Sequence, residues 1–273
     1  IARQIEALWR FHLRRLQPGT PPHRLTARVV FAQRPPVRVV SCAGCGTVYR
    51  DPRERERTLL ELYAGETPEP DTLGALFDAQ LAFYRRRARR LSEVAGRPGR
   101  GFEVGSYVGA FLAAARDEGW EFSGLDVNPE TNDFARARGF RVETGTPETL
   151  DSGGDDEPLD AVALWNCFDQ LPDPRGALRV IVRRLRPGGV VAIRVPNGAL
   201  YRAMLGRSGM PRPGGAWALA LNNLLGFPYR HGFTPSSLGG LLEATGGAGI
   251  VPFVTHRAAF VKAELTRAGG TQP

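Results

Sequence analysis

The sequence predicts an α/β protein whose main domain is a doubly wound, mostly parallel sheet with helices on both faces. Between about residues 100 and 195, apolar runs of strand length alternate with stretches whose apolar residues recur at helical spacing, a pattern typical of such a sheet. A turn between Gly105 and Gly109 joins the first strand to its helix, and Asp126 ends the next strand. A β-α-β unit of this kind holds nucleoside-like ligands at the carboxyl ends of its strands.

The other elements are predicted from their apolar patterns and from the glycine or proline at their ends. Residues 197–233 break the alternation, and a long irregular insertion after a strand is where lids and substrate pockets are built. The last two β-like runs predict an antiparallel hairpin at the sheet edge. The predicted strands are 102–104, 122–127, 141–144, 159–165, 190–195, 249–255 and 257–265, and the predicted helices are 71–95, one between Gly109 and Gly119, 129–138, 174–186 and 236–245.

Length and composition agree with one large domain and a small extra module. The chain has 273 residues and a net charge of +8, and Lys262 is its only lysine, so arginine supplies the charge. No stretch approaches the roughly 18 to 20 apolar residues of a membrane span. Three cysteines, two of them three residues apart, argue against a disulfide framework and favour a reducing, cytoplasmic location.

The N-terminal part, 1–66, is expected to form a small helix and hairpin module ahead of the main domain, 67–273. Residues 1–17 have helical spacing, two β-rich runs at 24–33 and 37–42 suggest a hairpin, and a helix is expected from about residue 54 to residue 63. A segment rich in proline, glutamate and glycine links the two parts.

Cys42 and Cys45 form a Cys-x-x-Cys-Gly turn, which is the geometry of a zinc knuckle. A complete zinc site needs four ligands, and the sequence holds no second pair at ligand spacing. His12 and His23 are the upstream candidates. We therefore expect a metal-free pair, with bound zinc as the alternative.

Five arginines lie close together in the run 85–90, inside the predicted helix 71–95. Apolar residues recur through this run at helical spacing, so its arginines are expected to form the solvated face of an amphipathic helix. A surface for nucleic acid or for another anion is the alternative interpretation.

The glycine turn differs from the turn that binds a dinucleotide. That turn reads G-x-G-x-x-G, so that backbone amides reach a pyrophosphate, whereas Tyr107 here occupies the crowded middle position. Asp126 follows about twenty residues later, where a carboxylate accepts hydrogen bonds from a ribose diol. A ribose site without a diphosphate site indicates S-adenosylmethionine.

At this point the sequence resembles the class I S-adenosylmethionine-dependent methyltransferases, and more narrowly bacterial small-molecule methyltransferases that carry a Cys-x-x-Cys-Gly module. The matching pieces are CAGCGTVYRDP, FEVGSYVGAF, GLDVNP, LDAVALWNCFDQLPDP, LRPGGVVAIRVPN and HGFTPSSL, in the order of that family. The resemblance implies a Rossmann-like sheet of seven strands and transfer of a methyl group to a small-molecule acceptor, such as a sugar or a secondary metabolite.

The resemblance also implies roles for residues around the turn. Glu103 is expected to fix the turn and approach the methionine ammonium, and Asp126 to bind the ribose hydroxyls. Thr146 stands where relatives often have an acidic residue that accepts a hydrogen bond from the adenine amino group. A threonine at this position weakens that contact. The residues expected to line the cofactor are Glu103, Gly105, Ser106, Tyr107, Gly109, Asp126, Val127, Asn128, Thr146 and Asn166.

A general base is needed only if the acceptor must lose a proton. Relatives often carry an acid and a histidine after the fourth strand, whereas this chain has Asp169 and Gln170. Asp169 and His231 are the predicted catalytic residues, and Tyr84 and Asn197 are candidates for contacts with the acceptor. Neighbouring Trp165 and Cys167 are interpreted as packing residues.

Three alternatives remain open at the level of sequence. A degenerate protein that binds S-adenosylmethionine without turnover is compatible with Gln170, Thr146 and the incomplete cysteine site. An NAD-dependent oxidoreductase is disfavoured by the missing G-x-G-x-x-G. A nucleic-acid methyltransferase is disfavoured because Asn166 leads into Cys167-Phe168 and not into a Pro-Pro-Tyr type motif.

Overall fold

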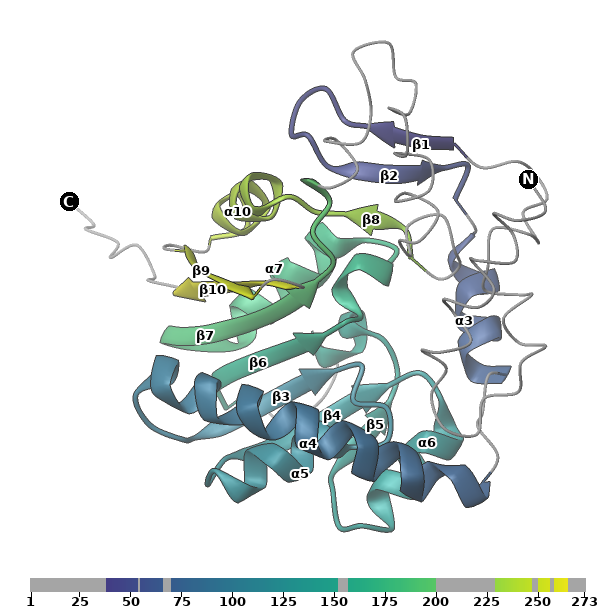
Figure 1. Ribbon diagram of the computed structural model, residues 1–273, viewed down its shortest axis with the longest axis vertical. Helices are drawn as coiled ribbons and strands as arrows, with labels where there is room; N and C mark the ends of the chain where they lie inside the picture. The colour runs from purple at the N-terminus through teal and green to yellow at the C-terminus, as the bar shows by residue number, and fades with distance from the viewer. Residues whose placement is uncertain are drawn as a thin grey trace.

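The computed structural model describes residues 38–53, 55–65, 70–151, 157–199, 229–246, 250–255 and 258–264. These ranges include the predicted doubly wound sheet and part of the N-terminal module (Figure 1). The predicted helix 1–17 and the β-rich run 24–33 lie outside them, as does most of the insertion 197–233.

One sheet of seven strands forms the centre of the described structure, in the order β5-β4-β3-β6-β7-β10-β9. The strands from β3 to β7 pair in parallel, and β10 lies antiparallel between β7 and β9. The predicted α/β sheet and its antiparallel edge hairpin are therefore confirmed. The strands are β3 (Arg100–Val104), β4 (Glu121–Asp126), β5 (Val142–Thr144), β6 (Leu159–Trp165), β7 (Leu185–Val195), β9 (Ile250–Thr255) and β10 (Ala258–Glu264).

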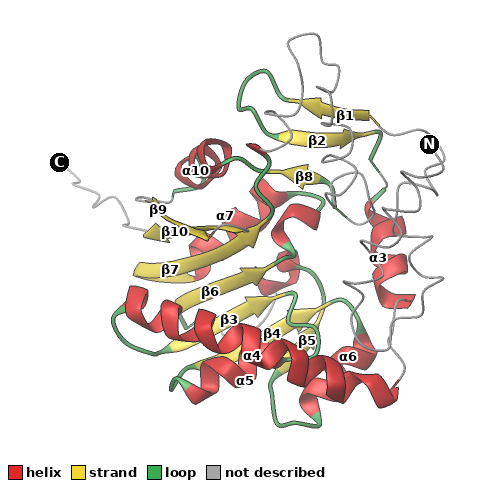
Figure 2. Ribbon diagram, in the orientation of Figure 1, coloured by secondary structure: helices red, strands yellow, loops and turns green. Residues whose placement is uncertain are grey.

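Helices cover both faces of this sheet (Figure 2). α4 and α5 pack together on one face, and α7 and α10 lie on the other. The helices around the sheet are α4 (Pro70–Ala95), α5 (Ala110–Asp117), α6 (Pro129–Arg136), α7 (Pro174–Arg184) and α10 (Pro235–Glu243).

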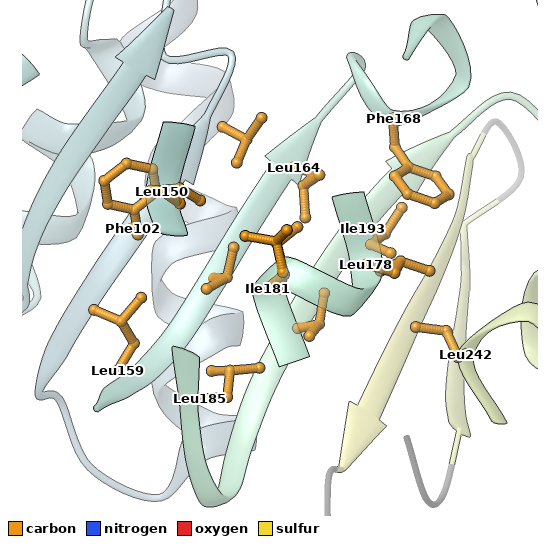
Figure 3. Close-up of a cluster of buried hydrophobic side chains, with 14 of the residues drawn as sticks. Phe102, Leu150, Leu159, Leu164, Phe168, Leu178, Ile181, Leu185, Ile193 and Leu242 are labelled. Carbon is orange, nitrogen blue, oxygen red and sulfur yellow. The ribbon is translucent and has the colours of Figure 1, made fainter. Parts of the chain in front are cut away.

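Alternation along β6 separates the two layers of the core. Ala163 and Trp165 belong to the layer with α4 and α5, whereas Val162 and Leu164 pack with α7 and α10. Figure 3 shows Leu164 beside side chains from α7 and β7. Because successive side chains of a strand point to opposite faces, a central strand covered on both sides is apolar at nearly every position.

Local capping signals begin three of the helices. Asn128, Asp173 and Thr234 each accept hydrogen bonds from backbone amides of the first helical turn, and a proline follows each of them. Such caps satisfy donors that have no partner inside the helix, and proline suits the first helical position. These signals explain why the predicted starts of α6, α7 and α10 agree closely with the structure.

A second, smaller sheet combines two distant parts of the chain. β1 (Arg38–Ser41) and β2 (Val48–Asp51) form a hairpin across the cysteine turn, and β8 (His231–Gly232) pairs with β2. The sequence indicated a hairpin between 24–33 and 37–42, but the described partner of the second run is β2. The end of the insertion 197–233 therefore adds a strand, β8, to the sheet that the N-terminal module begins. The domain boundary between residues 66 and 67 stays a prediction.

β7 is longer than the sequence indicates. The run Pro187-Gly188-Gly189 was expected to end a helix and to precede the strand, but the strand begins at Leu185 and includes it. Leu185 pairs with Leu159, and the register shifts before Ala161 pairs with Val190. An irregularity of this kind lets a strand accommodate glycine and proline without ending.

No helix in the described part of the chain has both the length and the apolar character that crossing a membrane requires.

Candidate cofactor and acceptor site

The turn after β3 has a backbone conformation that favours glycine. Gly105 and Gly109 have φ angles of 75° and 76°, and Tyr107 between them has a φ of 49°. A residue with a Cβ rarely adopts such values, so Tyr107 marks a strained position, and strained positions of this kind cluster at ligand sites. Ser106 is buried beneath the turn, and its hydroxyl has no hydrogen-bond partner among the described residues.

Asp126 connects the turn to the end of β4. Its Oδ2 accepts a hydrogen bond from the Tyr107 backbone N–H at 3.0 Å, and its Oδ1 accepts one from the Asn128 N–H at 3.0 Å. Burial raises the pKa of Asp126, and backbone hydrogen bonds, including these two, oppose the rise. The carboxylate is therefore held in a fixed orientation at the edge of the sheet, beside the turn.

Asp126 is not the cap of the helix that follows it. The cap of α6 is Asn128, whose Oδ1 accepts hydrogen bonds from the N–H groups of Glu130 and Thr131. An ionised carboxylate accepts about four hydrogen bonds, so Asp126 keeps acceptor capacity for a ligand beyond its backbone contacts with Tyr107, Val127 and Asn128.

Glu103 lies under the turn and is only 1% exposed. Its Oε2 has no hydrogen-bond partner among the described residues. Burial, and then the nearby Asp126 carboxylate, raise the pKa of Glu103 well above its ordinary value. A buried carboxyl without a partner is costly, and a cationic or donor group of a ligand would offset that cost.

α3 (Glu56–Gly65) lies across the carboxyl ends of the central strands (Figure 1). The carbonyl oxygen of Tyr63 accepts a hydrogen bond from Nδ2 of Asn128, and its hydroxyl donates to Oε1 of Gln170. Asn128 follows β4 and Gln170 follows β6, so Tyr63 bridges the two sides of the edge that carries the glycine turn. No sequence pattern indicates this bridge.

Asn166 and Cys167 follow β6 at the same edge. Asn166 has a φ of 61°, so it is a second residue other than glycine with a left-handed conformation at this site. The Cys167 thiol donates to the carbonyl oxygen of Val104 at 3.0 Å, and burial raises its pKa well above the ordinary value. A buried thiol with a raised pKa is a poor nucleophile, which supports the interpretation of Cys167 as a packing residue.

Asp169 lies in the short helical turn η3 (Phe168–Gln170) and is only 1% exposed. Neither of its carboxylate oxygens has a hydrogen-bond partner among the described residues. Burial raises its pKa to about 7, opposed by its own backbone amide and by the charge of Arg194. Its side chain is thus poised to gain or lose a proton near neutral pH.

The structure brings His231 close to Asp169. The Arg230 N–H donates to the carbonyl oxygen of Asp169, and His231 follows it in β8. Nε2 of His231 lies 3.2 Å from a guanidinium nitrogen of Arg53 and accepts its hydrogen bond, because a guanidinium can only donate. Burial and the charges of Arg53 and Arg230 lower the pKa of His231 to about 4, so the imidazole is neutral at pH 7.

The remaining predicted residues occupy different surroundings. Tyr84 on α4 packs edge-on against Phe111 and lies 6.4 Å from the ring of Trp165, and burial raises the pKa of its hydroxyl. Asn197 is exposed, and its side chain accepts from the Ala199 N–H. Val127 and Thr146 are half-buried at the ends of β4 and β5.

The cysteine turn lies in the small sheet, in the hairpin between β1 and β2. Backbone amides of Cys45 and Gly44 lower the pKa of the Cys42 thiol, and the Cys45 thiol donates to Oγ1 of Thr47 at 3.2 Å. The described ranges contain no group of three or more metal-binding side chains. Within them, the pair lacks the further ligands that a zinc site needs.

Two features define the Rossmann-like methyltransferase fold. One is the strand order, in which a single antiparallel strand, β10, lies between β7 and β9. The other is the turn after β3, which donates a backbone hydrogen bond to the carboxylate at the end of β4. The chain belongs to a family of methyltransferase domains, whose model matches residues 77–248. This match covers more than half of the chain, so the predicted resemblance to class I methyltransferases is confirmed. The cofactor of this class is S-adenosylmethionine.

Solved structures agree on the fold. The chain is similar to an O-methyltransferase family protein from Burkholderia thailandensis (TM-score 0.51, 18% identity, 76% of this chain and 62% of that one). It is also similar to a protein described as an O-methyltransferase from Nostoc punctiforme (TM-score 0.52, 15% identity, 77% and 66%). A third is human N-acetylserotonin methyltransferase in complex with S-adenosylmethionine (TM-score 0.51, 17% identity, 71% and 55%).

The chain spans less than two thirds of the length of each of these three structures. No curated protein matches the sequence.

Proposed function

We propose that the protein transfers a methyl group from S-adenosylmethionine to an oxygen, nitrogen or carbon atom of a small-molecule acceptor. The observation that carries this proposal is the Asp126 carboxylate, which is held against the strained turn at Tyr107 by a backbone hydrogen bond. This arrangement suits a ribose diol, and the absence of a dinucleotide turn in the sequence argues against a pyrophosphate.

The residues present fit this cofactor. Asp126 would accept hydrogen bonds from the two ribose hydroxyls. Glu103, whose buried Oε2 has no partner among the described residues, would stabilise the methionine ammonium from beneath the turn. The residues proposed to line the rest of the cofactor are Gly105, Ser106, Tyr107, Gly109, Val127, Asn128, Thr146 and Asn166.

When bound, S-adenosylmethionine supplies a methyl group that its sulfonium already activates. The contribution of the chain is therefore mainly to hold the acceptor atom in line with that methyl and to exclude water. Tyr63 supports this by fixing α3 over the carboxyl ends of the strands. Tyr84 and Asn197 are proposed to contact the acceptor.

Asp169 is proposed to take the proton of the acceptor where one must be lost. Its pKa of about 7 makes it an effective base near neutral pH. His231 is proposed to position the acceptor, because Arg53 already donates to its Nε2. If Asp169 is the base, the rate should rise with pH through about 7 in the parent and lose this dependence in Asp169→Asn.

Two binding measurements test the class of cofactor. Calorimetry should detect binding of S-adenosylhomocysteine and no binding of NADH. Binding of NADH alone would favour the oxidoreductase alternative and would overturn the proposal. Tritiated methyl transfer to a panel of phenols, amines and sugars then separates an enzyme from a degenerate protein that binds the cofactor without turnover.

The division into a module at 1–66 and a catalytic domain at 67–273 is also proposed, with the insertion 197–233 forming part of the acceptor pocket. It is supported by β8, which carries His231 from the end of the insertion into the small sheet. A cytoplasmic location remains a proposal from the low cysteine content of the sequence.

A further inference from the structure

The arginine run in α4 does not behave as a uniform solvated face. Arg85, Arg86, Arg89 and Arg90 are exposed, and three of them form ion pairs with Asp117, Glu118 and Glu93. This agrees with the interpretation of the run as the polar side of an amphipathic helix. Arg87 differs from them, because its side chain is half-buried and its guanidinium lies over the ring of Phe83.

Arg87 and Arg194 meet at the ring of Phe83. The guanidinium carbon of Arg87 lies 3.0 Å from the ring centroid, and that of Arg194 lies 5.1 Å from it. Arg87 also donates a hydrogen bond to the carbonyl oxygen of Phe83 at 2.6 Å. Arg194 stands near the end of β7 and points to the face covered by α4, as the alternation with Ile193 and Val195 requires. Two cations from different elements are thus held at one ring.

Within the described residues, Nε of Arg194 is buried and has no hydrogen-bond partner. Asp169 is near enough to affect its pKa but lies outside ion-pair distance, and burial lowers the pKa of Arg194 and of Arg87. Two half-buried cations that lie close together repel each other, and an anion bound by Arg194 beside Arg87 would reduce this repulsion.

This pair lies beside the candidate cofactor site. The carbonyl oxygen of Arg194 accepts from the N–H of Asn166, which follows β6 at the same edge as the glycine turn. Tyr84, next to Phe83, is close enough to both Glu103 and Arg194 for their charges to act on its hydroxyl. Any anion bound by the pair would therefore lie close to the reacting part of the site.

We propose that Arg194 and Arg87 form an oxyanion-binding subsite for a carboxylate or phosphate at the acceptor side of the cofactor. The fork of a guanidinium matches both anions with paired hydrogen bonds, and a half-buried location strengthens such bonds. The anion has two sources, the α-carboxylate of the cofactor or an anionic group on the acceptor. The placement of the subsite beside the cofactor rests on the proposed function. The binding of an anion by the two arginines does not depend on it.

Calorimetry on the full chain tests the subsite with four probes. S-adenosylhomocysteine carries the α-carboxylate, and 5′-methylthioadenosine is the matching nucleoside without it. Phenyl phosphate and benzoate, added to the S-adenosylhomocysteine complex, represent anionic acceptors, with phenol as their neutral control. The variants are Arg194→Gln and Arg87→Gln. The matched control is Arg116→Gln, whose guanidinium lies 4.9 Å over Phe140 on the exposed side of α5.

If the anion is the cofactor carboxylate, Arg194→Gln weakens S-adenosylhomocysteine about tenfold or more and leaves 5′-methylthioadenosine unchanged. If it belongs to the acceptor, the same variant leaves S-adenosylhomocysteine unchanged and weakens phenyl phosphate or benzoate by a similar factor, with phenol unaffected. Arg87→Gln should act in the same direction, and Arg116→Gln should change nothing.

The subsite is overturned if both variants bind every anionic probe as tightly as the parent does. Failure of the parent to bind S-adenosylhomocysteine would instead contradict the proposed function. In that case the subsite would still be supported if the parent binds phenyl phosphate and Arg194→Gln does not. If the parent does not bind phenyl phosphate either, the subsite would be overturned together with the proposed function.

Discussion

At the scale of single residues, Gly105 holds the turn after β3 in a conformation that side chains disfavour. Its φ is 75°, and a Cβ added there would lie 2.9 Å from Cβ of Cys167. Gly139 has a similar φ of 81°, but a Cβ added there meets nothing within 4 Å. Alanine at Gly139 therefore measures the cost of backbone strain alone, whereas alanine at Gly105 adds the cost of a steric clash with Cys167.

We expect Gly105→Ala to lower the free energy of unfolding by about 2 to 4 kcal/mol, and Gly139→Ala by only about 1 kcal/mol. Urea denaturation of the two variants measures the difference. Equal losses of unfolding free energy in the two variants would show that the Cys167 side chain moves aside at little cost and that the turn is not tightly packed.

A second prediction at this scale concerns how the stability of the folded protein depends on pH through Asp169. Its folded pKa of about 7 is raised above the ordinary value of 3.8, so the folded protein binds the proton more tightly than the unfolded chain. The stabilisation is therefore complete below about pH 4 and is lost as the pH rises toward 7, by up to about 1.4 kcal/mol per pH unit.

Asp169→Asn should remove this pH dependence without changing the shape of the side chain. In urea denaturation, the variant should gain stability relative to the parent as the pH is raised from 4 to 8. A difference between the two proteins that is constant over this range would mean that Asp169 keeps an ordinary pKa.

At the scale of elements, α3 is attached to the sheet edge through Tyr63. Removing the hydroxyl with Tyr63→Phe leaves Gln170 without its donor, and we expect a loss of about 1 kcal/mol in the free energy of unfolding. Arg57→Ala on the same helix is the control, because its ion pair with Glu61 is exposed and contributes little.

Thermal or urea unfolding compares these variants. A loss for Arg57→Ala as large as that for Tyr63→Phe would indicate that α3 is held by its surface charges and not by the bridge between Asn128 and Gln170.

Elements with local signals could be predicted from the sequence, and elements without them could not. The turn at Gly105 and the start of α6 at Pro129 are each specified by residues a few positions apart, so their placement was predicted closely. β8 has two residues and pairs with β2 about 180 residues earlier, so it carries no periodicity that a sequence pattern could reveal. The start of β7 at Leu185 was missed because proline and glycine ordinarily end an element.

At the scale of the whole molecule, the sequence predicted the sheet and the family, and both are confirmed. The candidate site was predicted only where it follows strand ends, as with Asp126, because carboxyl ends of parallel strands meet at one edge. Tyr63, Arg53 and Arg194 were not predicted. Each reaches the site through tertiary packing, which joins residues that the chain keeps far apart.

The binding of the cofactor through Asp126 is the central claim, and calorimetry with S-adenosylhomocysteine tests it most directly. Asp126→Ala should weaken binding by about 2 kcal/mol or more, roughly thirtyfold, because two hydrogen bonds to the ribose are lost. Asp133→Ala, an exposed acid on the neighbouring α6, is the matched control and should bind as the parent does. If Asp126→Ala binds S-adenosylhomocysteine as tightly as the parent, the assignment of the ribose site to the end of β4 is wrong.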